Sequence, residues 1–375
     1  MAHASCFANF SVLVQVNEHM MDMFCNWWFH YQLLKIHNPV YVVAHGADVV
    51  ATLVNDYRLA PERILSPPRM AAAGAGALAG SVRNFGSASF YALNTAKIRA
   101  AGDLMARTGR SVVFSDLDTV WLRSPLEQLE RLPPEKAFAI GPEGSPLDFN
   151  HAASTTLAPR APSPPPPAQA RKYYVCACFF AACPSGAARA IFDTWWTASG
   201  RETGRGNEQE GFEWLLNLWP ELVSGTASAG RGAARAALLK SKRIPRGIAE
   251  LLAAGDGWLE DLLRNSSDGL HVDLDGGARA SDARRYEGSV GLLRASGGPV
   301  AILPHAAFPT GRHDPPITSQ SVWIHANWIQ RKTRAATTVA KRGRLAKHGM
   351  WRHNCTNIAS HHLQTGAAQL VRVNN

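Results

Sequence analysis

The sequence lacks a long hydrophobic run. No stretch approaches the roughly 18 to 20 consecutive apolar residues that are needed to cross a bilayer. The first residues also lack a basic segment followed by an apolar run, which is the pattern of a secretory leader. We therefore expect a soluble chain, or the lumenal part of a longer protein that meets a membrane only through an anchor absent from this chain.

Cysteine is also scarce, with six residues in a chain of 375. They are too few for a small disulfide-dominated scaffold, and their spacing is not that of paired CxxC zinc ligands. Cysteine usage therefore leaves the redox compartment open. Three N-x-S/T sequons, at Asn9, Asn265 and Asn354, have a meaning only if the chain enters the secretory pathway.

Positive charge, in contrast, is in excess. The chain has 39 Lys and Arg residues against 29 Asp and Glu residues, a net charge of +10 that favours anionic partners such as phosphorylated ligands. Many of these cations follow residue 330, where aromatic residues only flank the run instead of alternating with it. We interpret this run as a solvated basic segment and expect no nucleic-acid partner.

Hydrophobic patterning predicts repeated strand–helix units. The expected elements, in chain order, are strand Phe10–Val16, helix Met20–Leu34, strand Val40–Ala44, helix Ala47–Tyr57, helix Tyr91–Arg107, strand Ser111–Phe114, strand Tyr173–Ala181 and helix Ala187–Trp196. Successive βα units indicate an α/β fold, with a mostly parallel sheet and helices on both of its faces.

We expect one domain over residues 1–335, because 375 residues with 46% hydrophobic content can bury one large core. A Pro-rich segment near 159–170 cannot sustain a helix or a strand ladder, and it is interpreted as a surface insertion. Beyond Arg331 the chain shows no clear apolar period before Leu363. Residues 336–375 are therefore predicted to be a basic C-terminal tail with little structure.

The strongest local pattern is the buried strand that ends in Asp116 and Asp118. Ligands of open α/β sheets gather at the carboxyl ends of strands. Two carboxylates at this spacing can turn toward one hard cation, which takes oxygen ligands and keeps positions free for a diphosphate. The bland alternative is an Asp pair that caps the next turn, but the apolar strand before it favours a metal site.

Two enzyme classes share this pattern. In a haloacid-dehalogenase-like phosphatase, Asp116 would be the nucleophile and Asp118 the general acid. That reading needs a second acidic pair after a strand, for which Asp256 and Asp261 are candidates, although the residues before them resemble a helix. The other class is sugar transfer from a nucleotide, and a non-catalytic protein that only binds glycans is the third possibility.

Further motifs along the chain bear on this choice. In order, they are Asn17 with Asn26-Trp27, Lys97, Ser115 to Pro125, Cys178-Phe-Phe180, Trp195, Asn207-Glu-Gln209, Leu303-Pro304 with Phe308 to Gly311, and His325-Ala-Asn-Trp328 with Lys332. This ordered series, over most of residues 10–332, resembles nucleotide-diphospho-sugar transferases of glycosyltransferase family 77, which includes plant and algal xylosyl-, galactosyl- and arabinosyltransferases.

The resemblance implies a GT-A-like, Rossmann-type fold and a metal-dependent glycosyltransferase that retains anomeric configuration. It places the Mn²⁺ or Mg²⁺ ion on Asp116, Asp118 and His325. A divalent cation there stabilises the charge that develops on a leaving diphosphate. The expected donor is a UDP-sugar carrying a pentose or hexose, the acceptor is a glycan or glycoprotein, and the expected location is the Golgi.

Four other residues receive roles from the same resemblance. Lys97 and Lys332 are expected to contact the donor diphosphate together with Asp116. Glu208 and Gln209 are the expected catalytic pair, either recognising sugar hydroxyls or supporting the reacting carbon. The chain departs from the family where Asn-x-Gly usually precedes an aromatic pair, because Cys176 and Cys178 occupy those two positions.

Overall fold

The computed structural model describes the chain in several ranges separated by gaps. These ranges are residues 5–67, 88–134, 136–142, 175–199, 208–209, 211–212, 300–304, 307–309, 317–326, 334–352 and 354–355. The Pro-rich insertion, the acidic pair at 256 and 261, and Lys332 lie outside them.

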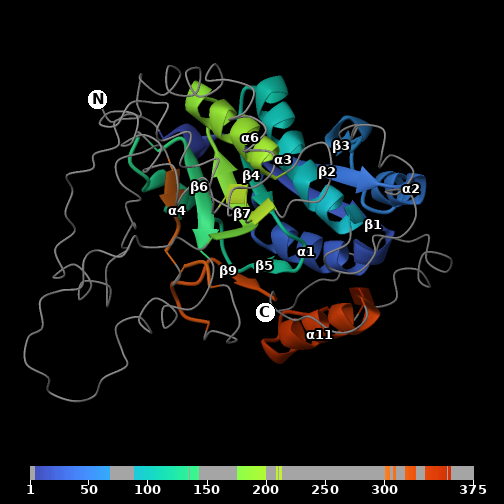
Figure 1. Cartoon of the computed structure of the whole chain (residues 1–375). Helices are drawn as coiled ribbons and strands as arrows, with labels where there is room; N and C mark the ends of the chain where they lie inside the picture. Colours follow the sequence, from blue (N-terminus) through green and yellow to red (C-terminus); the bar gives the residue numbers. More distant parts are fainter. Residues whose placement is uncertain are drawn as a thin grey trace, which may run out of the picture.

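A seven-stranded sheet forms the centre of the fold (Figure 1). Its spatial order is β3-β2-β1-β4-β7-β6-β8, and all strands run parallel except β7, which is antiparallel to both of its neighbours. The strands are β1 Phe10–Asn17, β2 Val40–His45, β3 Ile64–Leu65, β4 Ser111–Ser115, β6 Phe138–Pro142, β7 Val175–Ala182 and β8 Val300–Ile302. A separate two-stranded ladder pairs β5 Thr119–Trp121 with β9 Trp323–His325.

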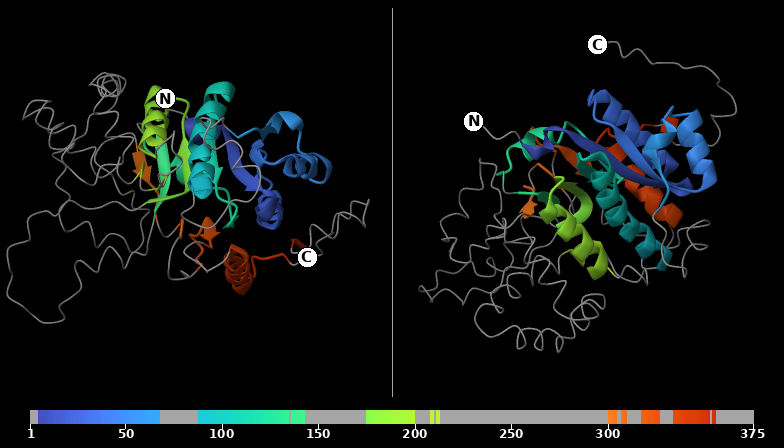
Figure 2. Two further views of the ribbon diagram at one scale, coloured as in Figure 1. Left: turned by 45° about the vertical axis from the view of Figure 1, so that its right-hand side comes forward. Right: turned by 90° about the horizontal axis from the view of Figure 1, so that it is seen from above.

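Helices cover both faces of the sheet, as two views show (Figure 2). The helices are α1 Met21–Leu33, α2 Ala47–Asn55, α3 Ala88–Thr108, α4 Leu126–Glu130, α6 Gly186–Ala198 and α11 Arg334–Lys347, with short 3-10 turns at Cys6–Ala8, Glu18–Met20 and Pro61–Arg63. Apolar residues of α1 and α2 share one buried cluster, and those of α3 and α6 share another. This confirms the predicted α/β class, with a mostly parallel sheet and helices on both faces.

The alternation of side chains along β1 explains why a buried cluster lies on each face of the sheet. Val12, Val14 and Val16 belong to the cluster on the α1 face, whereas Leu13 belongs to the cluster on the α3 face. Successive residues of a strand point to opposite faces, so a strand that is apolar throughout is buried on both sides.

One expectation about local structure is wrong. The segment beyond Arg331 was predicted to have little structure, but residues 334–347 form α11, in which Leu345 is completely buried. The helix is rich in Lys and Arg, so its docking depends on ion pairs that an apolar period does not reveal. The proposed division into a domain at 1–335 and a tail stays a prediction.

All six cysteines are paired in disulfides, which the sequence did not indicate. The pairs are Cys6–Cys183, Cys25–Cys355 and Cys176–Cys178. Stable disulfides are typical of proteins from oxidising compartments. No helix in the described ranges is both long and apolar enough to pass through a bilayer.

Candidate active site

The two carboxylates lie in a tight turn between β4 and β5. The backbone N–H of Asp116 donates to the carbonyl of Cys178 on β7, at 2.8 Å. The Thr119 hydroxyl donates to the carbonyl of Asp116 at 2.6 Å, and the N–H of Ala326 donates to the carbonyl of Asp118 at 2.9 Å. Neighbouring strands therefore hold the turn on both sides.

A buried hydroxyl secures the start of this turn. Ser115 Oγ accepts hydrogen bonds from the indole N–H groups of Trp27, at 3.3 Å, and Trp121, at 3.0 Å, and it lies 2.8 Å from Thr119 Oγ1. The two tryptophans are almost fully buried and pack edge to face. Because α1, β4 and β5 all meet at this hydroxyl, the turn has a rigid base.

Strand β7 is irregular beside the turn. Its pairing with β6 shifts register, because Ile140 opposes Phe180 while the next residue, Gly141, opposes Cys176. Such bulges bend a strand and redirect side chains, and they are frequent next to active sites. Here the irregularity lets two consecutive residues, Cys178 and Phe179, face the side of the sheet that carries α1.

The structure brings the predicted metal ligands together. Asp116, Asp118 and His325 each offer a ligand atom, and these atoms lie within 4.8 Å of one another. The pairing of β5 with β9 sets His325 opposite Thr119, so that His325 Nε2 is 3.2 Å from Asp118 Oδ1. The two carboxylates supply the hard oxygen donors that Mn²⁺ and Mg²⁺ prefer, and the imidazole adds one nitrogen donor.

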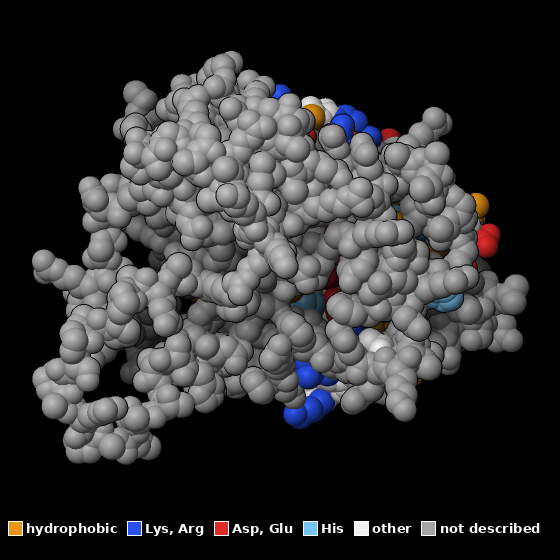
Figure 3. All heavy atoms as spheres, viewed as in Figure 1, with side chains coloured by type: hydrophobic (Ala, Val, Ile, Leu, Met, Phe, Trp, Pro, Cys, Tyr) orange, Lys and Arg blue, Asp and Glu red, His pale blue; other side chains and the backbone are white. Residues whose placement is uncertain are grey.

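Exposure differs between the two carboxylates. Asp118 and His325 are buried, whereas a third of the Asp116 side-chain surface remains accessible. Figure 3 shows acidic and histidine side chains together in a recess near the middle of one face, with Lys and Arg side chains below it. Of the three predicted ligands, Asp116 therefore has the most exposed side chain.

A buried lysine links Asp116 to the predicted catalytic glutamate. Lys97 Nζ of α3 lies 3.6 Å from Asp116 Oδ1 and 3.3 Å from Glu208 Oε1, and only 1% of the residue is exposed. Burial lowers the pKa of Lys97, but the two carboxylates outweigh it and raise that pKa above its ordinary value. Lys97 is thus a charged group near neutral pH, and its expected contact with a donor diphosphate stays a prediction.

Glu208 is anchored through its backbone carbonyl, and its side chain is buried. The Trp195 indole N–H donates to the Glu208 carbonyl at 2.6 Å, and the Glu208 side chain is buried. Its Oε2 atom has no hydrogen-bond partner among the described residues. A buried polar atom without a partner needs an explanation, and a sugar hydroxyl is one candidate. Gln209 follows directly and is partly buried.

Sequence reasoning missed one cation of the site. Lys341 Nζ of α11 forms an ion pair with Asp118 Oδ2. Burial raises the pKa of Asp118, but the charges of Lys341 and His325 more than reverse this and hold it well below its ordinary value. Of the residues expected to contact the diphosphate, Lys332 lies outside the described residues. Only the basic character of residues 331–347 hinted at Lys341.

Part of the chain matches a known protein family. Residues 65–233 match the family model described as nucleotide-diphospho-sugar transferase. The matched range contains Lys97, Asp116, Asp118 and Glu208, but it ends before His325 and Lys341.

A curated relative and two solved structures are similar to parts of the chain. The UDP-D-xylose:L-fucose alpha-1,3-D-xylosyltransferase MGP4 of Arabidopsis thaliana is 25% identical over 141 residues. The match covers 36% of each protein, so the chain spans about a third of the length of this relative. The solved structures are the galactosyltransferase LgtC (10% identity, TM-score 0.30, 46% of this chain and 58% of that one) and mouse xyloside xylosyltransferase 1 (10%, 0.31, 60% and 83%).

Proposed function

We propose that this chain, a glycosyltransferase of the nucleotide-diphospho-sugar type, moves a pentose or hexose from a UDP-sugar to a glycan or glycoprotein acceptor. The observation that carries the proposal is the convergence of Asp116, Asp118 and His325, although 207 residues separate the last two. The name of the Arabidopsis relative includes a UDP-linked pentose, which supports the donor class.

The proposed roles follow from charge and position. A divalent cation on Asp116, Asp118 and His325 supplies Lewis-acid stabilisation of a leaving diphosphate. Lys341 pairs with Oδ2 of Asp118, whereas His325 contacts Oδ1, and we assign to Lys341 the role of meeting the negative charge of that diphosphate. Lys97 fixes Asp116 and Glu208 relative to each other, because its ammonium pairs with both carboxylates.

Glu208 and Gln209 are proposed to bind the transferred sugar. Glu208 Oε2 is a buried acceptor, and Lys97 orients the carboxylate through its other oxygen. We assign retention of anomeric configuration to the reaction, as the family resemblance implies, and proton NMR of the first product would check it. We also place the protein in the Golgi, and its three disulfides support an oxidising compartment.

The first test measures UDP binding by calorimetry, with Mn²⁺ and then with EDTA. The wild type should bind UDP only with the metal. The variant Asp118→Asn should lose about tenfold or more in affinity, because it removes a charged ligand. The matched control is Asp103→Asn on α3, an exposed Asp whose substitution removes the same charge. Equal UDP affinity for Asp118→Asn and the wild type would rule out this metal site.

The two alternative functions predict other activities, which separate assays would detect. Phosphate release from simple phosphoesters, with trapping by beryllofluoride, would indicate the phosphatase in which Asp116 is a nucleophile. Glycan binding without metal or nucleotide would indicate a catalytically degenerate protein. The match of residues 65–233 to the transferase family favours sugar transfer over both.

A further inference from the structure

The Cys176–Cys178 disulfide differs from the other two in how much it can stabilise the fold. A disulfide stabilises mainly by restricting the unfolded chain, and the effect grows with the length of the closed loop. Cys6–Cys183 and Cys25–Cys355 join residues that are 177 and 330 positions apart, whereas Cys176 and Cys178 are two apart. Restriction of the unfolded chain therefore does not account for the third pair.

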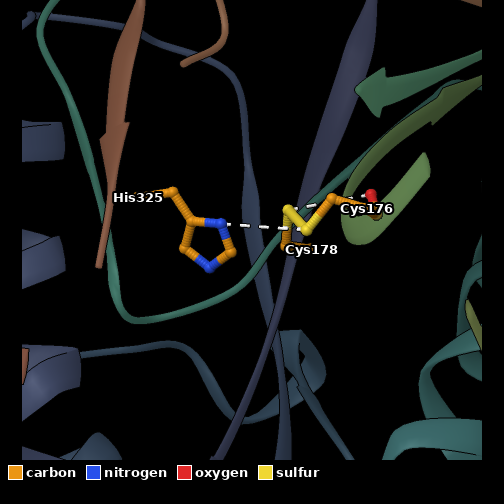
Figure 4. Close-up of side chains that lie close together, drawn as sticks. All are labelled: Cys176, Cys178 and His325. Carbon is orange, nitrogen blue, oxygen red and sulfur yellow. Dashed lines mark hydrogen bonds between the residues drawn. A yellow bond between two sulfur atoms is a disulfide. The ribbon is translucent and has the colours of Figure 1, made fainter. Parts of the chain in front are cut away.

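The residues around this disulfide indicate a role in binding a ligand instead. The disulfide faces the ring of His325 across the gap between β7 and β9 (Figure 4), with Cys176 Sγ 3.8 Å from His325 Nδ1. All three residues are buried. The other ring nitrogen, Nε2, is the atom that contacts Asp118. One imidazole thus stands between two sets of potential metal ligands.

The distances suit a soft divalent cation. Ligand atoms of Cys176, Cys178 and His325 lie within 4.8 Å of one another. With Zn–S bonds of about 2.3 Å and Zn–N bonds of about 2.0 to 2.1 Å, a tetrahedral site separates sulfur from nitrogen by about 3.6 Å. The Cys176–His325 separation already approaches this value. Two thiolates and an imidazole are the donors that zinc selects, and the fourth position stays open to water.

We propose that Cys176, Cys178 and His325 form a second metal site, which takes Zn²⁺ when the disulfide is reduced and is closed when it is oxidised. A dithiol or phosphine reductant supplies two electrons, the S–S bond breaks, and each sulfur gains a proton. With a phosphine, phosphorus is oxidised to the phosphine oxide and water supplies the oxygen atom and the two protons. Zinc binding then releases the two thiol protons to solvent.

The two metal sites exclude each other because they share His325. A neutral imidazole offers a metal the lone pair of one nitrogen only, because its other nitrogen carries a proton. When Nδ1 ligates zinc, Nε2 carries the proton and donates it to Asp118, so Nε2 cannot ligate Mn²⁺. Binding of zinc does not depend on the proposed transferase activity, but this antagonism rests on the proposed Mn²⁺ site.

Cobalt(II) is the probe for the new site, because thiolate ligation gives it charge-transfer bands in the near ultraviolet. The full chain, reduced with a phosphine in the absence of oxygen, should show these bands on addition of Co²⁺, and excess Zn²⁺ should abolish them. The oxidised chain should show none. Cys176→Ser with Cys178→Ser should lack the bands after the same treatment, although it keeps the other four cysteines.

Equal bands in the reduced wild type and the double variant would overturn the proposal, as would their absence from the reduced wild type. The single variant Cys178→Ser serves if the double variant does not fold, and its bands should be weaker because one thiolate is missing. A second measurement uses the electron paramagnetic resonance of free Mn²⁺. Zinc should weaken Mn²⁺ binding about tenfold or more in the reduced wild type but not in the double variant.

The two measurements separate the two proposals. Failure of Mn²⁺ to bind under any condition would count against the metal-dependent transferase and leave the cobalt result intact. Normal Mn²⁺ binding without cobalt–thiolate bands would count against the second site alone. Mn²⁺ binding that zinc leaves unchanged in a protein with cobalt–thiolate bands would overturn the antagonism.

Discussion

His45 is a titratable side chain enclosed at the end of β2. It is almost fully buried, and neither ring nitrogen has a hydrogen-bond partner among the described residues. Burial lowers its pKa from 6.5 to about 4, because the charged ring is poorly solvated there. The unfolded chain therefore binds a proton at a pH where folded His45 does not.

This difference predicts a loss of stability in mild acid. A side chain with a depressed folded pKa contributes its full stability above pH 6.5, and the contribution falls as the pH decreases toward about 4. At pH 5 the loss is on the order of 2 kcal/mol. Urea unfolding at pH 7 and pH 5 should show a smaller decrease for His45→Gln than for the wild type.

Exposed His37 provides the matched control. His37→Gln removes an imidazole without changing a buried site, so its free energy of unfolding should follow the pH dependence of the wild type. If His45→Gln and the wild type lose the same stability between pH 7 and pH 5, His45 is not the group responsible.

The residues of the site were predictable to different degrees. Asp116 and Asp118 follow a buried strand, which is a local pattern, so the sequence sufficed to identify them as ligand candidates. Lys97 and Glu208 entered through family resemblance, and the structure places both beside Asp116. Lys341 could not be predicted, because its partner Asp118 is 223 residues away.

Helix α11 is an element that the sequence analysis did not predict. It docks on α1 through an ion pair of Arg342 with Asp22, and Arg342 also lies over the Trp351 ring at 5.5 Å. The chain after the helix is fixed to α1 as well, since the Arg352 N–H donates to Asn26 Oδ1 at 3.0 Å. Leu345 supplies the buried apolar contact from the helix itself.

The docking of α11 predicts an effect of Leu345→Ala. Removing a completely buried leucine should cost about 2 to 5 kcal/mol of stability. The affinity for UDP with Mn²⁺ should fall as well, because a loosened helix no longer holds Lys341 beside Asp118. Urea unfolding and calorimetry measure the two effects.

Val339→Ala on the same helix is the control, because 62% of Val339 is exposed. It removes apolar atoms from α11 without opening a cavity, so both stability and UDP affinity should stay near the wild-type values. An unchanged UDP affinity in a destabilised Leu345→Ala variant would argue that α11 contributes nothing to the donor site.

At the scale of the whole molecule, two long-range disulfides tie distant segments to the sheet. Cys25 of α1 is joined to Cys355 near the described end of the chain, and Cys6 is joined to Cys183 directly after β7. Both cross-links restrict a long stretch of unfolded chain. The Cys25–Cys355 bond also fixes the described chain after α11 to α1.

The loop lengths predict an order of stabilities. Cys25→Ala with Cys355→Ala should lose roughly 2 to 4 kcal/mol of unfolding free energy, because it frees the longest loop. Cys176→Ala with Cys178→Ala should lose distinctly less, since its loop is two residues long. Urea unfolding of the oxidised proteins tests this order, and equal losses would contradict the entropic explanation.

The sequence by itself determined the α/β class, the buried strand that precedes the site and the Asp116–Asp118 pair. These features rest on local periodicity and on side chains a few residues apart. Only the tertiary structure decided the reversed direction of β7, the cysteine pairing, the docking of α11 and the meeting of His325 with Cys176. Apart from the Cys176–Cys178 pair, those features depend on contacts between residues far apart in the chain, and the energy of such contacts leaves no local periodic pattern.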